Sequence, residues 1–437
     1  MTQTTRMRYL RNNLAVGLIA GIFFFLPLTV YAVGIRSVAN TNETPTKLSI
    51  KLTSWTSLNS IDNFAIHNFP LQEQTIRFNT RLNQDVFHQA PSLGQDSSVA
   101  GVGVPTGNSN TSGGTSAESN IPKNSQKGFL QLPPTKPEAA LASTSLVTIG
   151  KNGWLYYTYE FSKECAPAKS IASITANLSR LEKIIAASGR SFVFTLAPDK
   201  SIAVPKYLPA NYPYKSCALP GSNAIFKSLS GANIPGYINM NSLITQHQSN
   251  ENREYYMRMD THWNGLATGL FAELAASYLN PALIENTQMN EMIVPYTGDL
   301  TVLLGAPKKD TTITTKIIRS GVTVGPLKNV SIGAGITTRE SVSATSASPL
   351  LTGRTLLVGD SFAEATISQI MPFASNFIFA KNIYFQQAPE TMFNEIQNSK
   401  TIILIWSERY FTDSNYGVLW STPFLNKLQK LLKPLAS

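Results

Sequence analysis

The sequence predicts an α/β fold with a mostly parallel sheet flanked by helices. Short apolar runs typical of buried strands recur along the C-terminal part of the chain, and amphipathic segments with helical spacing lie between them. Strands separated by helices pair in parallel, because each helix carries the chain back over one face of the sheet. The chain has 437 residues, 43% of them hydrophobic, which is enough for a sizeable buried core.

A membrane signal occupies residues 1–36. Three arginines among the first eleven residues precede an uncharged apolar run, which is long enough as a helix to cross a bilayer. The arginines predict a cytoplasmic N-terminus and export of the remainder. We interpret the segment as an uncleaved signal anchor, because the apolar run continues to Ile35, past the small-residue pattern Val30-Tyr31-Ala32. A signal peptide cleaved at that pattern is the alternative, and it also exports the protein.

Two segments separate this helix from the main domain. Residues 37–90 are predicted to form a helical lead-in, since apolar residues recur at helical spacing after Pro70. Residues 91–146 are rich in Ser, Gly, Asn, Thr and Pro, and such a stretch cannot bury enough apolar area to offset its ordering entropy. We therefore predict a disordered insertion at 91–146 and one folded domain at 147–437.

The elements of residues 147–437 can be placed in order. Apolar runs on both sides of Lys151-Asn152-Gly153 predict a β-hairpin, because Asn-Gly favours its turn. Leucines four residues apart after Asn264 predict a helix that Asn264 caps. Two further helices are predicted, one from Ile171 and one from Thr422. The predicted strands lie at 191–198, 236–240, 355–359, 376–380 and 401–406.

Ser361, His262 and Asp260 indicate nucleophilic catalysis. Ser361 follows a predicted strand and precedes a predicted helix, so its hydroxyl would lie at the carboxyl edge of the sheet, where a helix N-terminus can stabilise an oxyanion. A serine hydroxyl needs a base, and the base needs an acid to orient it. In an extended segment Asp260 and His262 project to the same side. The structural alternatives are a helix cap for Ser361 and a turn histidine for His262, and Asp360 is predicted to stabilise the turn.

The two cysteines of the chain, Cys165 and Cys217, predict a disulfide, because an even pair in an exported protein is typically oxidised. Closing that loop would contribute about 4 kcal/mol in the chain-entropy model. Two buried reduced thiols are the alternative.

Charge and ligand patterns exclude several functions. The net charge is +10, and residues 1–36 hold four arginines and no acids, which leaves 10 − 4 = +6 on the exported part. This mildly basic charge suits an anionic polymer or a membrane surface, and also an ordinary basic surface. No dense Lys/Arg stripe interleaved with aromatic residues is present, so we predict no nucleic-acid binding. No histidine or cysteine cluster has ligand spacing and no glycine loop could cradle phosphate, so we predict no metal and no cofactor.

Five segments, GKNGWLYY, LAPDKSIAVPKYLP, DTHWNGLATG, GDSF and SERYF, occur in the order that resembles the alginate O-acetyltransferase family of SGNH-like exported proteins. The resemblance covers most of residues 147–437. Its most specific feature is an Asp-x-His-Trp segment that precedes Gly-Asp-Ser, because ordinary SGNH hydrolases carry the serine first. Lys200, Arg258, Glu408 and Arg409 match or adjoin these motifs. The insertion at 91–146 departs from the family pattern.

The resemblance implies an SGNH-like fold and a periplasmic O-acetyltransferase at the bacterial inner membrane. Ser361 would be the nucleophile, His262 the general base and then acid, and Asp260 the residue that orients it. A membrane-bound acyltransferase would supply acetyl groups, which would pass through acetyl-Ser361 to a hydroxyl of an exopolysaccharide such as alginate. The alternatives are a polysaccharide acetylesterase with the same triad and a non-catalytic scaffold for polysaccharide secretion.

Overall fold

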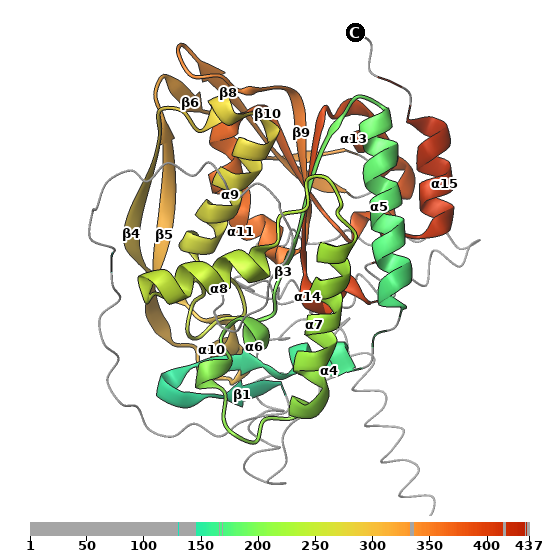
Figure 1. Ribbon diagram of the computed structural model, residues 1–437. Helices are drawn as coiled ribbons and strands as arrows, with labels where there is room; N and C mark the ends of the chain where they lie inside the picture. Colours follow the sequence, from blue (N-terminus) through green and yellow to red (C-terminus); the bar gives the residue numbers. More distant parts are fainter. Residues whose placement is uncertain are drawn as a thin grey trace, which may run out of the picture. The chain divides into compact units, whose positions relative to one another are not determined.

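The fold is taken from a computed structural model of the chain, shown in Figure 1. The chain divides into two compact units, residues 1–99 and 100–437, and the described residues belong to the second. The predicted membrane helix, the helical lead-in and nearly all of the predicted insertion lie outside the described residues, and the domain boundaries stay predictions. None of the described helices has both the length and the apolarity needed to cross a bilayer. The structure describes residues 130, 146–165, 167, 169–332, 336–413, 417–432 and 434.

One mixed sheet organises the described residues (Figure 1). Its strands follow the order β3-β11-β9-β10-β8-β6, and β7 also pairs with β8. The first four strands in this order are parallel, whereas β8 is antiparallel to β10, β6 and β7. The prediction of a mostly parallel sheet is therefore corrected to a mixed sheet. The strands are β3 (Ser191–Ala197), β6 (Val322–Val324), β7 (Lys328–Ser331), β8 (Thr337–Thr345), β9 (Leu351–Gly359), β10 (Ala374–Lys381) and β11 (Thr401–Ser407).

The antiparallel strands are formed by residues 322–345, and the described residues of this range form no helix between β6, β7 and β8. Short turns cannot carry the chain across the sheet, so β7 and β8 pair antiparallel. β7 and β8 are mostly polar, and many side chains of the three strands are exposed or half-buried; Val342 in β8 is 69% exposed. A search for continuous apolar runs detects parallel strands buried on both faces and misses strands of this kind.

The parallel strands are buried on both faces, and all seven residues of β11 are buried. Side chains alternate between the faces, so that Leu357 and Ile403 pack with α9 and α11, whereas Leu356 and Ile402 pack with α5, α7, α13 and α15. In Figure 1 α9 lies on one side of the sheet and α5 and α15 lie on the other. The long helices are α5 (Ile171–Ala187), α7 (Lys215–Gly231), α8 (Met240–Glu251), α9 (Gly265–Leu279), α11 (Ser361–Ile370), α13 (Pro389–Asn398) and α15 (Thr422–Leu431).

Most of the elements predicted for this part of the chain are confirmed. Four of the five predicted strands are β3, β9, β10 and β11, and the four predicted helices are α5, α9, α11 and α15. The side chain of Asn264 accepts from Leu266 N at 2.9 Å, as predicted for a cap. The strand predicted at 236–240 is wrong, because Tyr237 makes only an isolated bridge to Phe194 before α8 begins at Met240.

Two hairpins lie outside the mixed sheet. β1 (Val147–Ile149) pairs with β2 (Leu155–Tyr157), as predicted. Asn152 and Gly153 between them have φ of 56° and 74°, the left-handed region that asparagine and glycine tolerate best. The sequence does not predict the second hairpin, β4 (Thr287–Thr297) with β5 (Lys309–Arg319), because β4 is largely exposed and its apolar residues do not alternate with polar ones.

Several short helices and a disulfide complete the fold. Cys165 and Cys217 form the predicted disulfide, which joins the end of α4 to the first turn of α7. The short helices are α4 (Thr158–Cys165), α6 (Lys200–Ala203), α10 (Asp299–Leu303), α12 (Tyr384–Gln387) and α14 (Glu408–Phe411), with 3-10 turns at Lys151–Gly153, Pro205–Tyr207, Pro281–Leu283 and Met371–Phe373.

Candidate active site

Ser361 is the first residue of α11 and follows the end of β9. Asp360 caps the helix, because its Oδ1 accepts from Phe362 N at 2.9 Å. Its Oδ2 accepts from the backbone N–H and the hydroxyl of Ser407 at 2.7 and 2.6 Å, which ties the cap to the end of β11. Asp360 therefore stabilises the turn as predicted, and the structure does not support the capping alternative for Ser361.

Gly359 allows the turn that presents Ser361. A Cβ atom at this position would lie 1.9 Å from the carbonyl oxygen of Ile405 and 2.5 Å from the Cβ of Ala363, so a larger residue would push β9 away from β11 and α11. With glycine, the Ser361 hydroxyl lies at the carboxyl edge of the parallel strands and at a helix N-terminus. Partial positive charge at that terminus favours an anion beside the hydroxyl.

His262 and Asp260 lie where the sequence predicts them, beside Ser361. Nε2 of His262 and Oγ of Ser361 are hydrogen-bonded. On the other side of the ring, Nδ1 of His262 lies 3.3 Å from Oδ1 of Asp260, and the same oxygen accepts from His262 N at 3.3 Å. Both side chains are 2% exposed. The three predicted residues are thus brought together, although the contact between imidazole and Asp260 is long.

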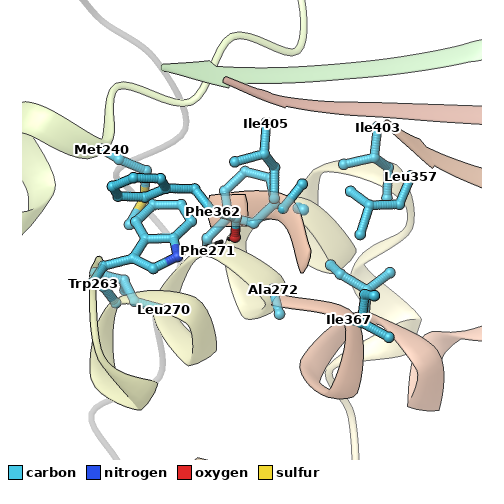
Figure 2. Close-up of a cluster of buried hydrophobic side chains, with 14 of the residues drawn as sticks. Met240, Trp263, Leu270, Phe271, Ala272, Leu357, Phe362, Ile367, Ile403 and Ile405 are labelled. Carbon is cyan, nitrogen blue, oxygen red and sulfur yellow. Dashed lines mark hydrogen bonds between the residues drawn. The ribbon is translucent and has the colours of Figure 1, made fainter. Parts of the chain in front are cut away.

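Aromatic packing holds the imidazole against α11. The ring of Phe362 lies 4.7 Å from the imidazole of His262, between ring centroids, and 5.5 Å from the ring of Trp263. The indole Nε1 of Trp263 donates to the carbonyl oxygen of Phe362 at 3.2 Å. Figure 2 shows Trp263 and Phe362 packed together within the core cluster that α9, α11 and the sheet share. Trp263 therefore joins the histidine segment to the serine helix.

A buried lysine fixes the backbone that leads to His262. Nζ of Lys200 donates to the carbonyl oxygens of Met257, Arg258 and Asp260 at 2.9, 2.8 and 2.8 Å. Three acceptors match the three donors of an ammonium group. Burial lowers the pKa of Lys200 to about 7, against the opposing charge of Glu160. Lys200, a residue of the motif LAPDKSIAVPKYLP, therefore fixes the backbone of residues 257–260 by hydrogen bonds within the core.

Arg409 lies in a buried acid cluster, which we define as Glu160, Asp199 and Glu408. Its Nη1 lies 2.6 Å from Oδ1 of Asp199 and 3.4 Å from Oε1 of Glu160. Burial and the charge of Asp199 raise the pKa of Glu160 and that of Glu408 to about 8 each. The guanidinium carbon also lies 5.1 Å from the centre of the Phe362 ring, so the cluster adjoins the site.

The surroundings keep His262 neutral. Burial lowers the pKa of His262 well below its usual range, and the charges of Arg409 and Lys200 lower it further. Burial raises the pKa of Asp260 well above its usual range, and repulsion from Asp299 raises it further. A neutral imidazole that contacts a serine hydroxyl can accept the proton of that hydroxyl.

Two residues that the sequence analysis does not identify also reach the imidazole. Oγ1 of Thr261 lies 2.9 Å from Nδ1 of His262, and it donates to Oδ2 of Asp299 at 2.6 Å. Asp299 follows β4 and begins α10, which is unpredicted in sequence, so no pattern connects it to His262. The glycine before it, Gly298, is the one sequence feature that points to a close approach here. A Cβ atom at Gly298 would lie 2.1 Å from the carbonyl oxygen of Met259.

Asn382 is a further polar residue near the serine turn. It follows β10, and its backbone N–H donates to the carbonyl oxygen of Gly359 at 2.9 Å. The side chain is 5% exposed, and its Nδ2 is buried without a hydrogen-bond partner. A buried amide donor without a partner is costly in a native structure, which makes it a candidate for binding a ligand oxygen.

Donor atoms of Asp260, His262 and Asp299 lie within 4.8 Å of one another, a spacing that could hold a metal ion. The carboxylate oxygens already accept hydrogen bonds from Thr261 and from backbone N–H groups, and Nδ1 of His262 lies within hydrogen-bond distance of Asp260 and Thr261. Nζ of Lys200 also lies beside this group, because it donates to the backbone carbonyl oxygen of Asp260 at 2.8 Å. We therefore interpret the three residues as a hydrogen-bonded group and assign no metal to it.

A known protein family matches about half of this chain. A family model described as an SGNH hydrolase-like domain of the acetyltransferase AlgX matches residues 147–366, which include Asp260, His262 and Ser361. No curated protein sequence matches this chain significantly.

Several solved structures are similar to this chain at low identity. The O-acetyltransferase domain of Pseudomonas putida AlgJ is 16% identical, over 65% of this chain and 98% of that domain, with a TM-score of 0.40. Bacillus cereus PatB1 is 12% identical, over 62% of this chain and 98% of PatB1, with a TM-score of 0.40. Pseudomonas aeruginosa AlgX is 13% identical, over 66% of each chain, with a TM-score of 0.40.

Proposed function

We propose a function from one premise: this chain belongs to the family of SGNH hydrolase-like domains of the acetyltransferase AlgX. The proposed reaction is transfer of an acetyl group through an acetyl-Ser361 intermediate to a hydroxyl of an exopolysaccharide, with alginate as one candidate. The observation that carries the proposal is the hydrogen bond between Ser361 Oγ and the buried, neutral His262 at the N-terminus of α11.

The first half of the proposed reaction forms the acetyl-enzyme. Nε2 of His262 accepts the hydroxyl proton of Ser361 while Oγ bonds to the acetyl carbonyl carbon. The carbonyl electron pair moves to the oxygen and returns as the bond to the donor group breaks, and His262 gives its proton to the departing group. In the second half His262 takes a proton from the acceptor hydroxyl, whose oxygen bonds to the acetyl carbon. The bond from that carbon to Oγ of Ser361 then breaks, and His262 gives its proton to Oγ, which restores the free enzyme.

Stabilisation of the oxyanion needs donors beside Ser361. We propose the backbone N–H of Ser361, at the positive end of α11, and the side-chain amide of Asn382. The unpartnered Nδ2 of Asn382 and the bond from its backbone to Gly359 O support this assignment.

Replacing Asn382 by alanine is expected to lower kcat toward an acetyl ester about 10²-fold and to leave KM nearly unchanged, because the donor acts on the transition state. Asn223→Ala, which alters an exposed asparagine within helix α7, is the control. Steady-state kinetics of the full chain measure both constants. A change in kcat below threefold would remove Asn382 from the oxyanion site.

The pH profile tests the protonation state of His262. Because burial, Arg409 and Lys200 disfavour the imidazolium form, the pKa of His262 lies well below its usual value. A base with a depressed pKa stays neutral as the pH falls through that usual value. We therefore expect kcat/KM toward an acetyl ester to stay level down to and below pH ~6.5, the pKa of an ordinary histidine. A half-maximal rate near pH ~6.5 would contradict the electrostatic argument.

We also propose that the domain acts outside the cytoplasm, in the periplasm, with residues 1–36 as its membrane anchor. The Cys165–Cys217 disulfide supports an oxidising compartment. The proposed partners are an exopolysaccharide as acceptor and a membrane-bound acyltransferase as acetyl donor. Fractionation of expressing cells, with and without disruption of the outer envelope, tests the location.

The test of the proposed function is an acetyl-partition assay with the full chain and a chromogenic acetyl ester. We expect the wild type to release the chromophore, and added polysaccharide to take up acetyl groups at the expense of free acetate. His262→Ala is expected to do neither. Complete release of acetate in the presence of polymer would favour the acetylesterase alternative, and equal rates for both proteins would favour the scaffold.

A further inference from the structure

Three oxygen atoms lie near Nδ1 of His262, and their distances from it differ. The Thr261 hydroxyl lies 2.9 Å from Nδ1, whereas the nearest oxygen of Asp260 lies 3.3 Å away and that of Asp299 lies 3.8 Å away. The shortest contact is therefore with a neutral hydroxyl. What this hydroxyl does depends on its other neighbour, Asp299.

A threonine hydroxyl has one proton to donate. Thr261 Oγ1 lies 2.6 Å from Oδ2 of Asp299, a length typical of a hydroxyl that donates to a carboxylate. If this proton goes to Asp299, Thr261 can only accept from His262, and Nδ1 must carry the ring proton. Nε2 is then unprotonated where it contacts Ser361, which is the tautomer that a general base requires.

Asp299 is the better of the two carboxyl groups for holding negative charge. It accepts from the hydroxyl of Thr261 at 2.6 Å and from Thr261 N at 2.8 Å. Asp260 accepts longer bonds, from Asp299 N at 3.1 Å and from His262 N at 3.3 Å. Two buried carboxyl groups in contact share a proton more readily than they both ionise, and the shorter bonds favour the charge on Asp299.

Residues next to Asp299 in the sequence bring it into contact with Thr261. Asp299 begins α10 directly after Gly298, and the Gly298 Cα lies so close to the Met259 carbonyl that no side chain fits. Met259 N in turn donates to the hydroxyl of Tyr296 near the end of β4 at 3.1 Å. The end of the β4 hairpin strand therefore carries Asp299 against the segment that holds Thr261 and His262.

We propose that Asp299, acting through the Thr261 hydroxyl, is a positioning residue that fixes the Nδ1–H tautomer of His262. Asp260 then accepts hydrogen bonds from the backbone and shares a proton with Asp299, and it is not the only residue that orients the imidazole. This inference deepens the proposed function and rests on it for its kinetic part.

Nitrogen NMR tests the proposal without any substrate. The full chain, labelled with ¹⁵N-histidine, has four histidines, and loss of one signal in His262→Gln assigns the ring. Wild type is expected to show the Nδ1–H tautomer. Asp299→Asn keeps the shape but places an amide donor near Thr261, so the hydroxyl turns toward Nδ1 and the proton moves to Nε2. Thr261→Val is expected to weaken the Nδ1–H preference, and Thr261→Ser to restore it.

Kinetics with the same variants provide the second readout. We expect Asp299→Asn to lower kcat toward an acetyl ester about 10³-fold and Thr261→Val about 10-fold, with KM unchanged, since neither residue touches substrate. Thr268→Val is the matched control, because Thr268 is a buried threonine in α9 whose hydroxyl donates to a backbone carbonyl.

The two readouts separate the two hypotheses. A wild-type tautomer in both Asp299→Asn and Thr261→Val would overturn the positioning role, even if the enzyme proves active. If the variants shift the tautomer but the wild type transfers no acetyl, the positioning role is supported and the proposed function is rejected. If Asp299→Asn fails to fold, which thermal unfolding detects, Thr261→Val against Thr261→Ser decides the outcome.

Discussion

Ser361→Ala is expected to lower kcat toward an acetyl ester by roughly 10⁴-fold or more, with little change in KM or in the free energy of unfolding. The hydroxyl is the only atom of Ser361 for which the proposed reaction has a covalent use, and Asp360, not Ser361, caps α11. Removal of this oxygen therefore removes the nucleophile and leaves the helix cap intact. Initial rates of the purified full chain measure the loss.

Ser368→Ala provides the control for this experiment. Ser368 lies on the same helix, α11, but is exposed and donates to the side chain of Gln369. We expect its rate to stay within about twofold of wild type, as for other substitutions at exposed positions. An active Ser361→Ala variant would show that any esterase activity comes from another group, and that the hydrogen bond to His262 has no catalytic use.

Arg409→Met is expected to destabilise the folded state by about 3–5 kcal/mol, the range for breaking a buried ion pair from one side. Arg409 is 4% exposed, and its guanidinium faces Asp199 and Glu160, both fully buried. Methionine would fill much of the space but leave the acid cluster without its counter-charge. Urea denaturation of the full chain measures the free energy of unfolding.

The loss of stability in Arg409→Met should depend on pH. Burial already raises the pKa of Glu160 to about 8, and loss of the guanidinium charge would raise it further. A group whose folded pKa exceeds its unfolded pKa contributes stability at low pH that is lost as the pH rises through the folded value. We therefore expect a larger deficit at pH ~8 than at pH ~5. A deficit that grows toward acid would contradict this assignment of charges.

Arg180→Met is the matched control for the acid cluster. The guanidinium of Arg180 donates to the neutral side chains of Asn426 and Gln429 at 2.7 and 2.8 Å, so no carboxylate loses a partner. We expect a change within about 0.5 kcal/mol, with no dependence on pH. A similar loss in both arginine variants would mean that packing, and not charge, stabilises the Arg409 site.

The part of the fold that sequence predicts is the part buried on both faces. β3, β9, β10 and β11 are continuous apolar runs, and α5, α9 and α15 have regular apolar spacing, so local patterns suffice. The strands β4 to β8 are polar or largely exposed, and they lack the continuous apolar runs that mark the buried strands. The strand predicted at 236–240 is wrong because α8 begins before a ladder can form.

Some residues of the candidate site can likewise be predicted from the sequence, and others cannot. Ser361 is recognisable from its place between a strand and a helix, and His262 with Asp260 from their spacing. Asp299 and Asn382 could not be found by spacing, because tertiary contacts bring them there: Asp299 through the β4 hairpin, Asn382 through the pairing of β10 with β9. Arg409 lies in a recognisable motif, but its acid partners come from α4 and from the end of β3.

The central claim is that acetyl passes through Ser361, and the most direct test is mass spectrometry of the enzyme during turnover. The full chain is mixed with an acetyl ester in the absence of polysaccharide, quenched with acid and digested. The proposed reaction predicts one acetyl group on the peptide that contains Ser361, gained in wild type, absent in His262→Ala and lost when polysaccharide is added before the quench. Turnover with no acetyl on this peptide, or with acetyl on another residue, would contradict the proposed reaction.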